Sequence, residues 1–133
     1  MAFATPEEAA LAGERTTELT QVLTGLRIGD TAALVVTSPG WPYPELVWCY
    51  RDDDGWTEGQ NTSGRTTWSQ TEDDPEDVGL LVCWHDAEPG AHTVRISFAG
   101  RTIERPVENG HVIWAVEALP RDRIDEPAKF VWG

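Results

Sequence analysis

Lysine is almost absent from this chain, and the shortage of positive charge limits what the protein can bind. Of the ten basic residues only Lys129 is a lysine, whereas 23 residues are acidic, so that the formal net charge is −13. A nucleic-acid-binding protein needs a basic stripe that displaces counterions from the phosphates. Anionic membrane surfaces also attract basic segments. We therefore expect no nucleic-acid partner and no membrane partner.

Long apolar runs and cysteines are scarce as well. No stretch approaches the roughly 20 apolar residues that span a bilayer, and residues 1–13 lack the basic region and apolar core of a signal peptide. These features predict a cytoplasmic protein. Cys49 and Cys83 lie in apolar, strand-like runs, and in a reducing compartment we expect buried free thiols. A disulfide between them is the alternative.

The negative charge is concentrated in the middle of the chain. Residues 45–90 hold twelve acidic and two basic residues, whereas residues 91–133 hold six of each. The acidic residues form two clusters, Asp52-Asp53-Asp54 and Glu72–Asp77. Such a surface suits a basic protein partner. The alternative is that the charge only keeps the domain soluble and monomeric.

Near the C-terminal end, alternating apolar and polar residues set a strand register. With Ala99-Gly100 as a tight turn, Ile96 lies opposite Ile103 on the apolar face, and Arg95 lies opposite Glu104 on the wet face. A slip of one residue would move every side chain to the wrong face. The pattern therefore predicts an antiparallel hairpin with one buried face.

A second turn signal follows this hairpin. Asn109-Gly110 is typical of a two-residue loop, because both residues tolerate positive φ. Continued pairing across this loop would place Val107 opposite Val112. It would also bring the guanidinium of Arg105 over the indole of Trp114. We therefore expect a three-stranded meander over residues 93–119.

The rest of the chain also indicates strands, after one short helix that begins at Thr5-Pro6-Glu7-Glu8. Residues 17–28 fit either a helical stripe or a strand, and a strand hairpin with residues 31–37 is favoured. Two central strands are expected over residues 45–51 and 78–85. Further strands are expected around Trp56 and Trp68, and an edge strand is expected over residues 129–132. Residues 60–65 and 120–127 are expected to be a polar loop and an exposed charged linker.

These elements predict a single domain, residues 1–133, of the all-β class. We expect an antiparallel sandwich or partly closed barrel of about eight or nine short strands, with one short N-terminal helix.

The chain also resembles, through four segments, small uncharacterised proteins of actinobacterial type. The segments are Ala4–Ala12, Gly29–Ala32, Asp54–Trp56 and Pro106–Gly110. The C-terminal meander resembles an immunoglobulin-like half-sandwich, although the Cys, Trp and Cys spacing of true immunoglobulin domains is absent. The resemblance implies an architecture and no activity.

Motifs of catalysis and metal binding are missing. Asp52-Asp53-Asp54-Gly55 does not continue into the alternating oxygen ligands of a calcium loop. Cys83, His85 and the other histidines have no zinc-ligand spacing, and no serine stands in a nucleophile elbow. We therefore expect no metal, no cofactor and, on balance, no enzyme.

The tryptophans and their polar neighbours are the candidate site. Trp41, Trp56 and Trp68 flank polar loops in the acidic middle, and a pair of them exposed together would form a stacking platform. Gln60, Asn61 and the aspartates Asp52, Asp53 and Asp54 could then hydrogen-bond a sugar or hold a cation. The alternative for these tryptophans is core filling.

Three functions are therefore open from the sequence. The first is a non-catalytic interaction module that meets a basic protein, for example an immunity-type inhibitor of a cationic toxin. The second is a carbohydrate- or organic-cation-binding domain that uses exposed tryptophans. The third is a hydrolase without a recognisable motif.

Overall fold

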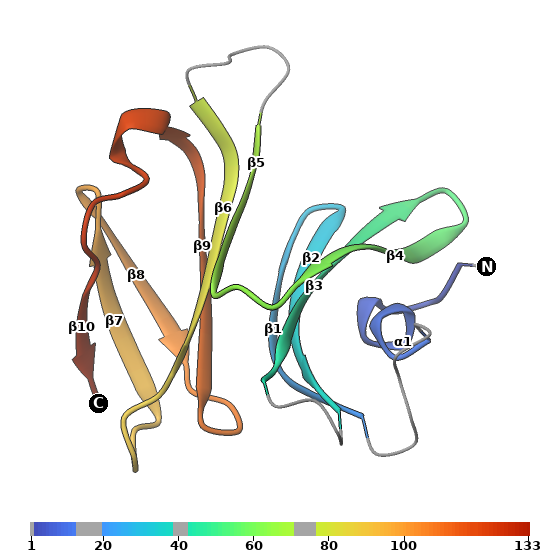
Figure 1. Ribbon diagram of the computed structural model, residues 1–133, viewed down its shortest axis with the longest axis horizontal. Helices are drawn as coiled ribbons and strands as arrows, with labels where there is room; N and C mark the ends of the chain where they lie inside the picture. Colours follow the sequence, from blue (N-terminus) through green and yellow to red (C-terminus); the bar gives the residue numbers. More distant parts are fainter. Residues whose placement is uncertain (1, 13–19, 39–42, 71–76) are drawn as a thin grey trace. The chain divides into compact units, whose positions relative to one another are not determined.

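Antiparallel strands and one short α-helix make up this computed structural model, which describes residues 2–12, 20–38, 43–70 and 77–133 (Figure 1). The chain divides into two compact units, residues 1–64 and residues 65–133. The all-β prediction is confirmed. The single domain stays a prediction, because compactness by itself does not show whether a unit folds independently.

The first unit is a four-stranded antiparallel sheet with a helix on one face. The sheet has the order β1-β2-β3-β4. The elements are α1 (Pro6–Ala10), β1 (Gln21–Ile28), β2 (Thr31–Thr37), β3 (Glu45–Asp52) and β4 (Gly55–Thr62). Ala9 and Ala10 of α1 pack against Leu34, Val47 and other buried residues of the sheet. β3 is a central strand, as its two apolar sides predicted.

Helix α1 begins as the sequence predicted. Thr5 Oγ1 accepts a hydrogen bond of 3.2 Å from the Glu8 N–H, and Pro6 occupies the first turn. No helix among the described residues is long and apolar enough to cross a membrane. The helix ends at Ala10, with Leu11 as its C-terminal cap. The favoured strand over residues 17–28 is confirmed from Gln21 onward as β1.

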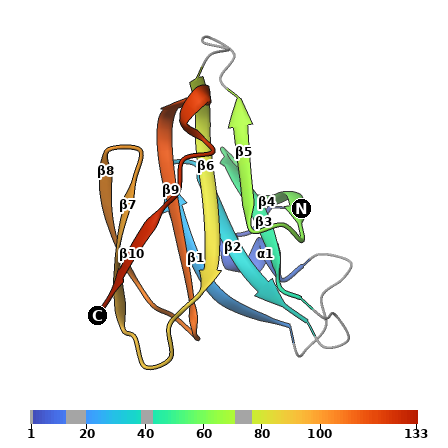
Figure 2. The ribbon, with the colours of Figure 1, turned by 60° about the vertical axis from the view of Figure 1, so that its left-hand side comes forward.

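The second unit contains two three-stranded antiparallel sheets. One sheet has the order β5-β6-β9 and the other has the order β10-β7-β8 (Figure 2). The strands are β5 (Thr66–Gln70), β6 (Asp77–Asp86), β7 (Thr93–Phe98), β8 (Arg101–Pro106), β9 (His111–Pro120) and β10 (Lys129–Trp132). Leu81 of β6, Ile96 of β7 and Trp114 of β9 share one buried cluster. The two sheets therefore pack face to face as a small sandwich.

The hairpin of β7 and β8 has the register that the sequence predicted. Ile96 pairs with Ile103, and Arg95 pairs with Glu104. The turn residue Ala99 has a φ of 50°, a value that an L-residue adopts only at a cost and that the two-residue loop requires. β10 pairs with β7 at the edge of the same sheet, which confirms the expected closing strand.

The predicted continuation of this meander into β9 is wrong. The turn at Asn109-Gly110 forms, but the pairing stops after a single bridge between Glu108 and His111. β9 then pairs with β6 in the other sheet, so Val107 does not face Val112. The long β6 offers β9 a partner over nearly its whole length, whereas β8 ends at Pro106, which has no N–H for a ladder.

Arginine side chains connect β8 and β9 where the ladder is absent. Arg105 Nε donates to the Ile113 carbonyl over 2.8 Å. Arg101 donates to the carbonyls of Glu117 and Ala118. The arginines thus satisfy carbonyls of an edge strand that would otherwise face no strand partner.

Two predicted loops are more ordered than expected. Residues 60–65 were expected to form a loop, but β4 extends to Thr62. Within 120–127, a short 3-10 helix, η1 (Arg121–Arg123), is followed by Ile124, which packs against the core of the second unit. The apolar side chain of Ile124 makes this segment a docked connection.

Replacing Arg105 by methionine should destabilise the protein. The variant keeps an unbranched side chain but removes the donor to the carbonyl of buried Ile113, which should lower the free energy of unfolding by about 1.5–3 kcal/mol. Urea denaturation measures this difference. Arg95→Met is the matched control, because it breaks an exposed ion pair on the same sheet and should cost about 1 kcal/mol or less. Equal losses in the two variants would contradict the assigned role of Arg105.

Candidate functional site

The turn between β3 and β4 presents three aspartates on a fixed backbone. The Asp54 N–H donates to Asp52 Oδ1 over 2.8 Å, which closes a local turn. Gly55 follows with a φ of 123°, and a Cβ there would lie 2.6 Å from the Phe3 carbonyl oxygen. Phe3 and Trp56 exchange backbone hydrogen bonds of 2.8 and 2.7 Å. The N-terminal segment therefore holds the hairpin close to its tip.

The carboxylates of this turn face solvent. Asp52, Asp53 and Asp54 are all exposed, and no ion pair links them to a basic group within the described part of the chain. No group of three metal-binding side chains occurs among the described residues either. The second acidic cluster, Glu72–Asp77, lies outside the described residues up to residue 76.

The arginines, by contrast, are used inside the protein. Each arginine of the described ranges contacts a carboxylate, a backbone carbonyl or an indole ring of its own unit. These arginines are Arg27, Arg51, Arg65, Arg95, Arg101, Arg105, Arg121 and Arg123. The exposed carboxylates of the hairpin therefore carry charge that no described arginine neutralises.

Trp56 does not contribute to an exposed platform. Its side chain is 1% exposed and belongs to the core under α1. Arg27 and Arg51 lie 4.6 and 5.4 Å from the ring centroid, and Arg51 also pairs with Asp30. Core filling, the alternative that the sequence left open, describes this tryptophan.

The other two predicted tryptophans differ from Trp56. Trp68 is 42% exposed on β5, with the guanidinium of Arg121 at 5.2 Å from its ring centroid. Trp41 lies outside the described residues. Trp56 belongs to the first unit and Trp68 to the second, and of these two rings only that of Trp68 is exposed.

Gln60 and Asn61 are exposed but distant from the aspartates. They lie near the end of β4, whereas the aspartates lie at its beginning. Asn61 lies six positions after Gly55, which corresponds to about 20 Å along an extended strand. The predicted site residues therefore divide into an acidic tip and a separate amide pair.

Tyr50 is the residue of this hairpin that the sequence reasoning missed. Its side chain is 45% exposed at the end of β3. The alternation placed it with buried Leu46 and Trp48, because a strand pattern assigns a face but not the point at which the cover of that face ends. The polar run that follows Tyr50 was the available signal.

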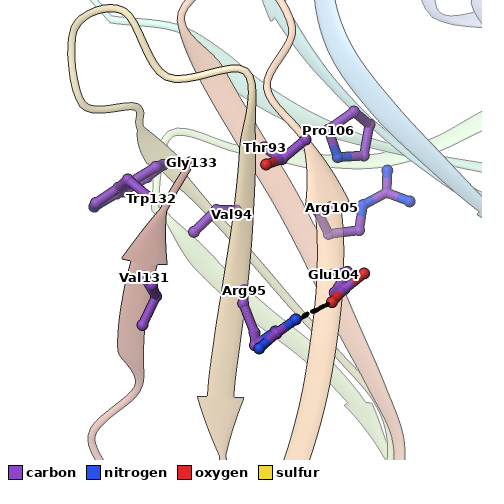
Figure 3. A pocket seen from close by; sticks show the side chains of 9 residues that line it. All are labelled: Thr93, Val94, Arg95, Glu104, Arg105, Pro106, Val131, Trp132 and Gly133. Atoms are coloured by element: carbon purple, nitrogen blue, oxygen red, sulfur yellow. Dashed lines mark hydrogen bonds and ion pairs between the residues drawn. The ribbon is translucent and has the colours of Figure 1, made fainter.

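A shallow groove of about 500 Å³ lies on the sheet of β10, β7 and β8 (Figure 3). Figure 3 shows Arg95 and Glu104 meeting within it, joined at 2.8 Å. Val131, 67% exposed, and Pro106 supply apolar surface. Arg95 and Glu104 neutralise each other, and Arg105, which also lines the groove, donates to the Ile113 carbonyl. No cysteine, histidine or serine lines the groove, so none of the candidate nucleophiles or zinc ligands of the sequence lies there.

The buried thiols are poor nucleophiles. Burial raises the pKa of Cys49 to about 12 and that of Cys83 to about 11. The Cys49 thiol donates to the Pro6 carbonyl oxygen, and Thr66 donates to the sulfur of Cys83. Because a thiolate is the reactive form, neither cysteine is activated at neutral pH.

Comparison with protein-family models, with curated proteins and with solved structures found no match. The resemblance to actinobacterial-type proteins and to an immunoglobulin-like half-sandwich therefore stays a prediction.

The stability of the second unit should depend on the protonation of His85. This ring stacks on Trp114 and meets Phe130 edge-on, and its Nε2 is buried without a partner among the described residues. Burial, and then Arg65, lower the pKa of His85 below 6.5, while Asp86 acts in the opposite direction. The unfolded chain therefore binds this proton more readily, and stability should fall as the pH drops below about 6.5.

His85→Phe keeps an aromatic ring and removes the titration. Urea denaturation at pH values from 8 to 5 should show a smaller loss of unfolding free energy for this variant than for the unmodified protein. The other two histidines are present in both proteins and cancel in the comparison. Parallel stability curves would contradict the prediction.

Proposed function

We propose that this chain is a non-catalytic interaction module whose acidic β3–β4 hairpin binds a basic protein. The observation that carries the proposal is the contrast between its two kinds of charge. Every described arginine has an internal partner, whereas Asp52, Asp53 and Asp54 stand exposed on a braced turn. A fixed group of unneutralised carboxylates attracts a cationic surface and orients it before contact.

An immunity-type inhibitor of a cationic toxin is one concrete form of this function, because fast encounter with a basic enzyme is what such an inhibitor needs. We keep the cytoplasm as the proposed location, where Cys49 and Cys83, both free and buried, would stay reduced. The alternative of a tryptophan-based ligand site has less support, since Trp56 is buried. No arrangement of described side chains favours the hydrolase alternative.

Neutralising the hairpin should weaken partner binding selectively. The test variant is Asp52→Asn, Asp53→Asn and Asp54→Asn together, and the matched control is Glu88→Gln, Asp122→Asn and Asp125→Asn. Both sets change the net charge equally and alter exposed side chains. Pull-downs from native lysate at about 50 mM and about 500 mM salt identify the partner, because high salt screens surface charges.

The proposal expects a basic protein that is retained at low salt and lost at high salt. This partner should associate with the hairpin variant about tenfold or more slowly than with the unmodified protein. Its association rate with the control variant should fall much less. Retention by the hairpin variant equal to that of the unmodified protein would overturn the proposal. Absence of any basic partner at both salt concentrations would also overturn it.

A further inference from the structure

The ring of Tyr50 lies where a glycine leaves room for it. A Cβ built on Gly59 would come within 2.3 Å of Tyr50 Cε2 and 2.8 Å of Cδ2. Gly59 does not have the positive φ that commonly calls for glycine. Space for the Tyr50 ring is therefore what glycine provides at this position of β4.

Tyr50 and Asp52 form an exposed pair on one face of β3. Alternate residues of a strand point to the same side, and both side chains are exposed. No cation–π contact among the described residues involves Tyr50. An aromatic ring and a carboxylate are thus presented together to solvent.

Elsewhere in this chain, an aromatic residue and an aspartate two positions apart on a strand both contact one arginine. On β6, Trp84 and Asp86 also stand two residues apart on one side of the strand. The Arg65 guanidinium lies 4.4 Å from the Trp84 ring centroid, and its Nη2 lies 3.2 Å from Asp86 Oδ2. Arg51 makes the same two kinds of contact, with the Trp56 ring and with Asp30. A guanidinium therefore contacts a ring and an aspartate together at two places in this protein, and at Arg65 these two residues have the strand spacing of Tyr50 and Asp52.

We propose that Tyr50 and Asp52 form an arginine-binding site, seated on Gly59, which receives an arginine side chain of the basic partner. The inference rests on the proposed function and specifies its contact chemistry. Arginine fits better than lysine, because its planar guanidinium stacks on a ring while its edge donates to a carboxylate. The neighbouring Asp53 and Asp54 add attraction that does not distinguish the two cations.

Hexa-arginine and hexa-lysine peptides test this site with equal formal charge. The unmodified protein should bind hexa-arginine about two- to fivefold more tightly than hexa-lysine at matched ionic strength. Tyr50→Leu and Gly59→Ala should remove this preference while leaving hexa-lysine binding unchanged. Tyr43→Leu is the control, since Tyr43 is the other tyrosine and is also exposed. Calorimetry measures affinity, and thermal unfolding checks that each variant is folded.

The NMR signals of the Tyr50 ring supply a readout in the unmodified protein. The chain has two tyrosines, so the tyrosine ring signals that remain in the Tyr43→Leu variant belong to Tyr50. Hexa-arginine should shift the Tyr50 ring signals more than hexa-lysine does. Equal affinities and equal shifts would overturn the arginine site, yet the proposed function would stand if the triple asparagine variant bound both peptides more weakly. If that variant bound both peptides as the unmodified protein does, the acidic hairpin itself would be excluded.

Discussion

The engagement of arginine inside the protein is the interaction on which the rest of the structure depends. With one lysine in the sequence, nearly all positive charge resides on planar guanidinium groups, which can donate to several acceptors and stack on rings at the same time. The chain uses both properties. Arg101 and Arg105 bind carbonyls of β9, and Arg65 contacts an indole and a carboxylate together. These arginines join neighbouring strands where backbone pairing ends.

This internal use of arginine determines the character of the surface. A carboxylate with an arginine beside it presents little net field, whereas Asp52, Asp53 and Asp54 have no such neighbour in the described ranges. The exposed carboxylates of this hairpin lie close together in the sequence, on a turn that the Phe3–Trp56 hydrogen bonds hold in place. Concentrated charge on a rigid turn favours orientation as well as attraction.

The sequence predictions succeeded where the structure depends on residues close together in the sequence, and they failed where it depends on distant strands. The β7–β8 register followed from the alternation and from two turn residues, because a two-residue loop fixes the pairing of its flanking strands. The next turn also formed, yet β9 joined β6. That choice depends on a strand more than twenty residues earlier in the chain, which no local pattern identifies. The acidic tip was predictable for the same local reason as the first hairpin, whereas the separation of Gln60 from it follows from the full length of β4.

The sequence by itself determined the all-β class, the helix start at Thr5, the hairpin at Ala99-Gly100 and the concentration of acidic charge, because propensity, turn chemistry and charge act over a few residues. Tertiary structure alone decided which sheet receives β9, that Trp56 is buried, and that Tyr50 is exposed beside Gly59. Alternation along a strand assigns a side chain to a face. Whether that face is covered at a given point depends on elements far away in the sequence, so burial, and with it the choice of candidate binding residues, is a property of the assembled fold.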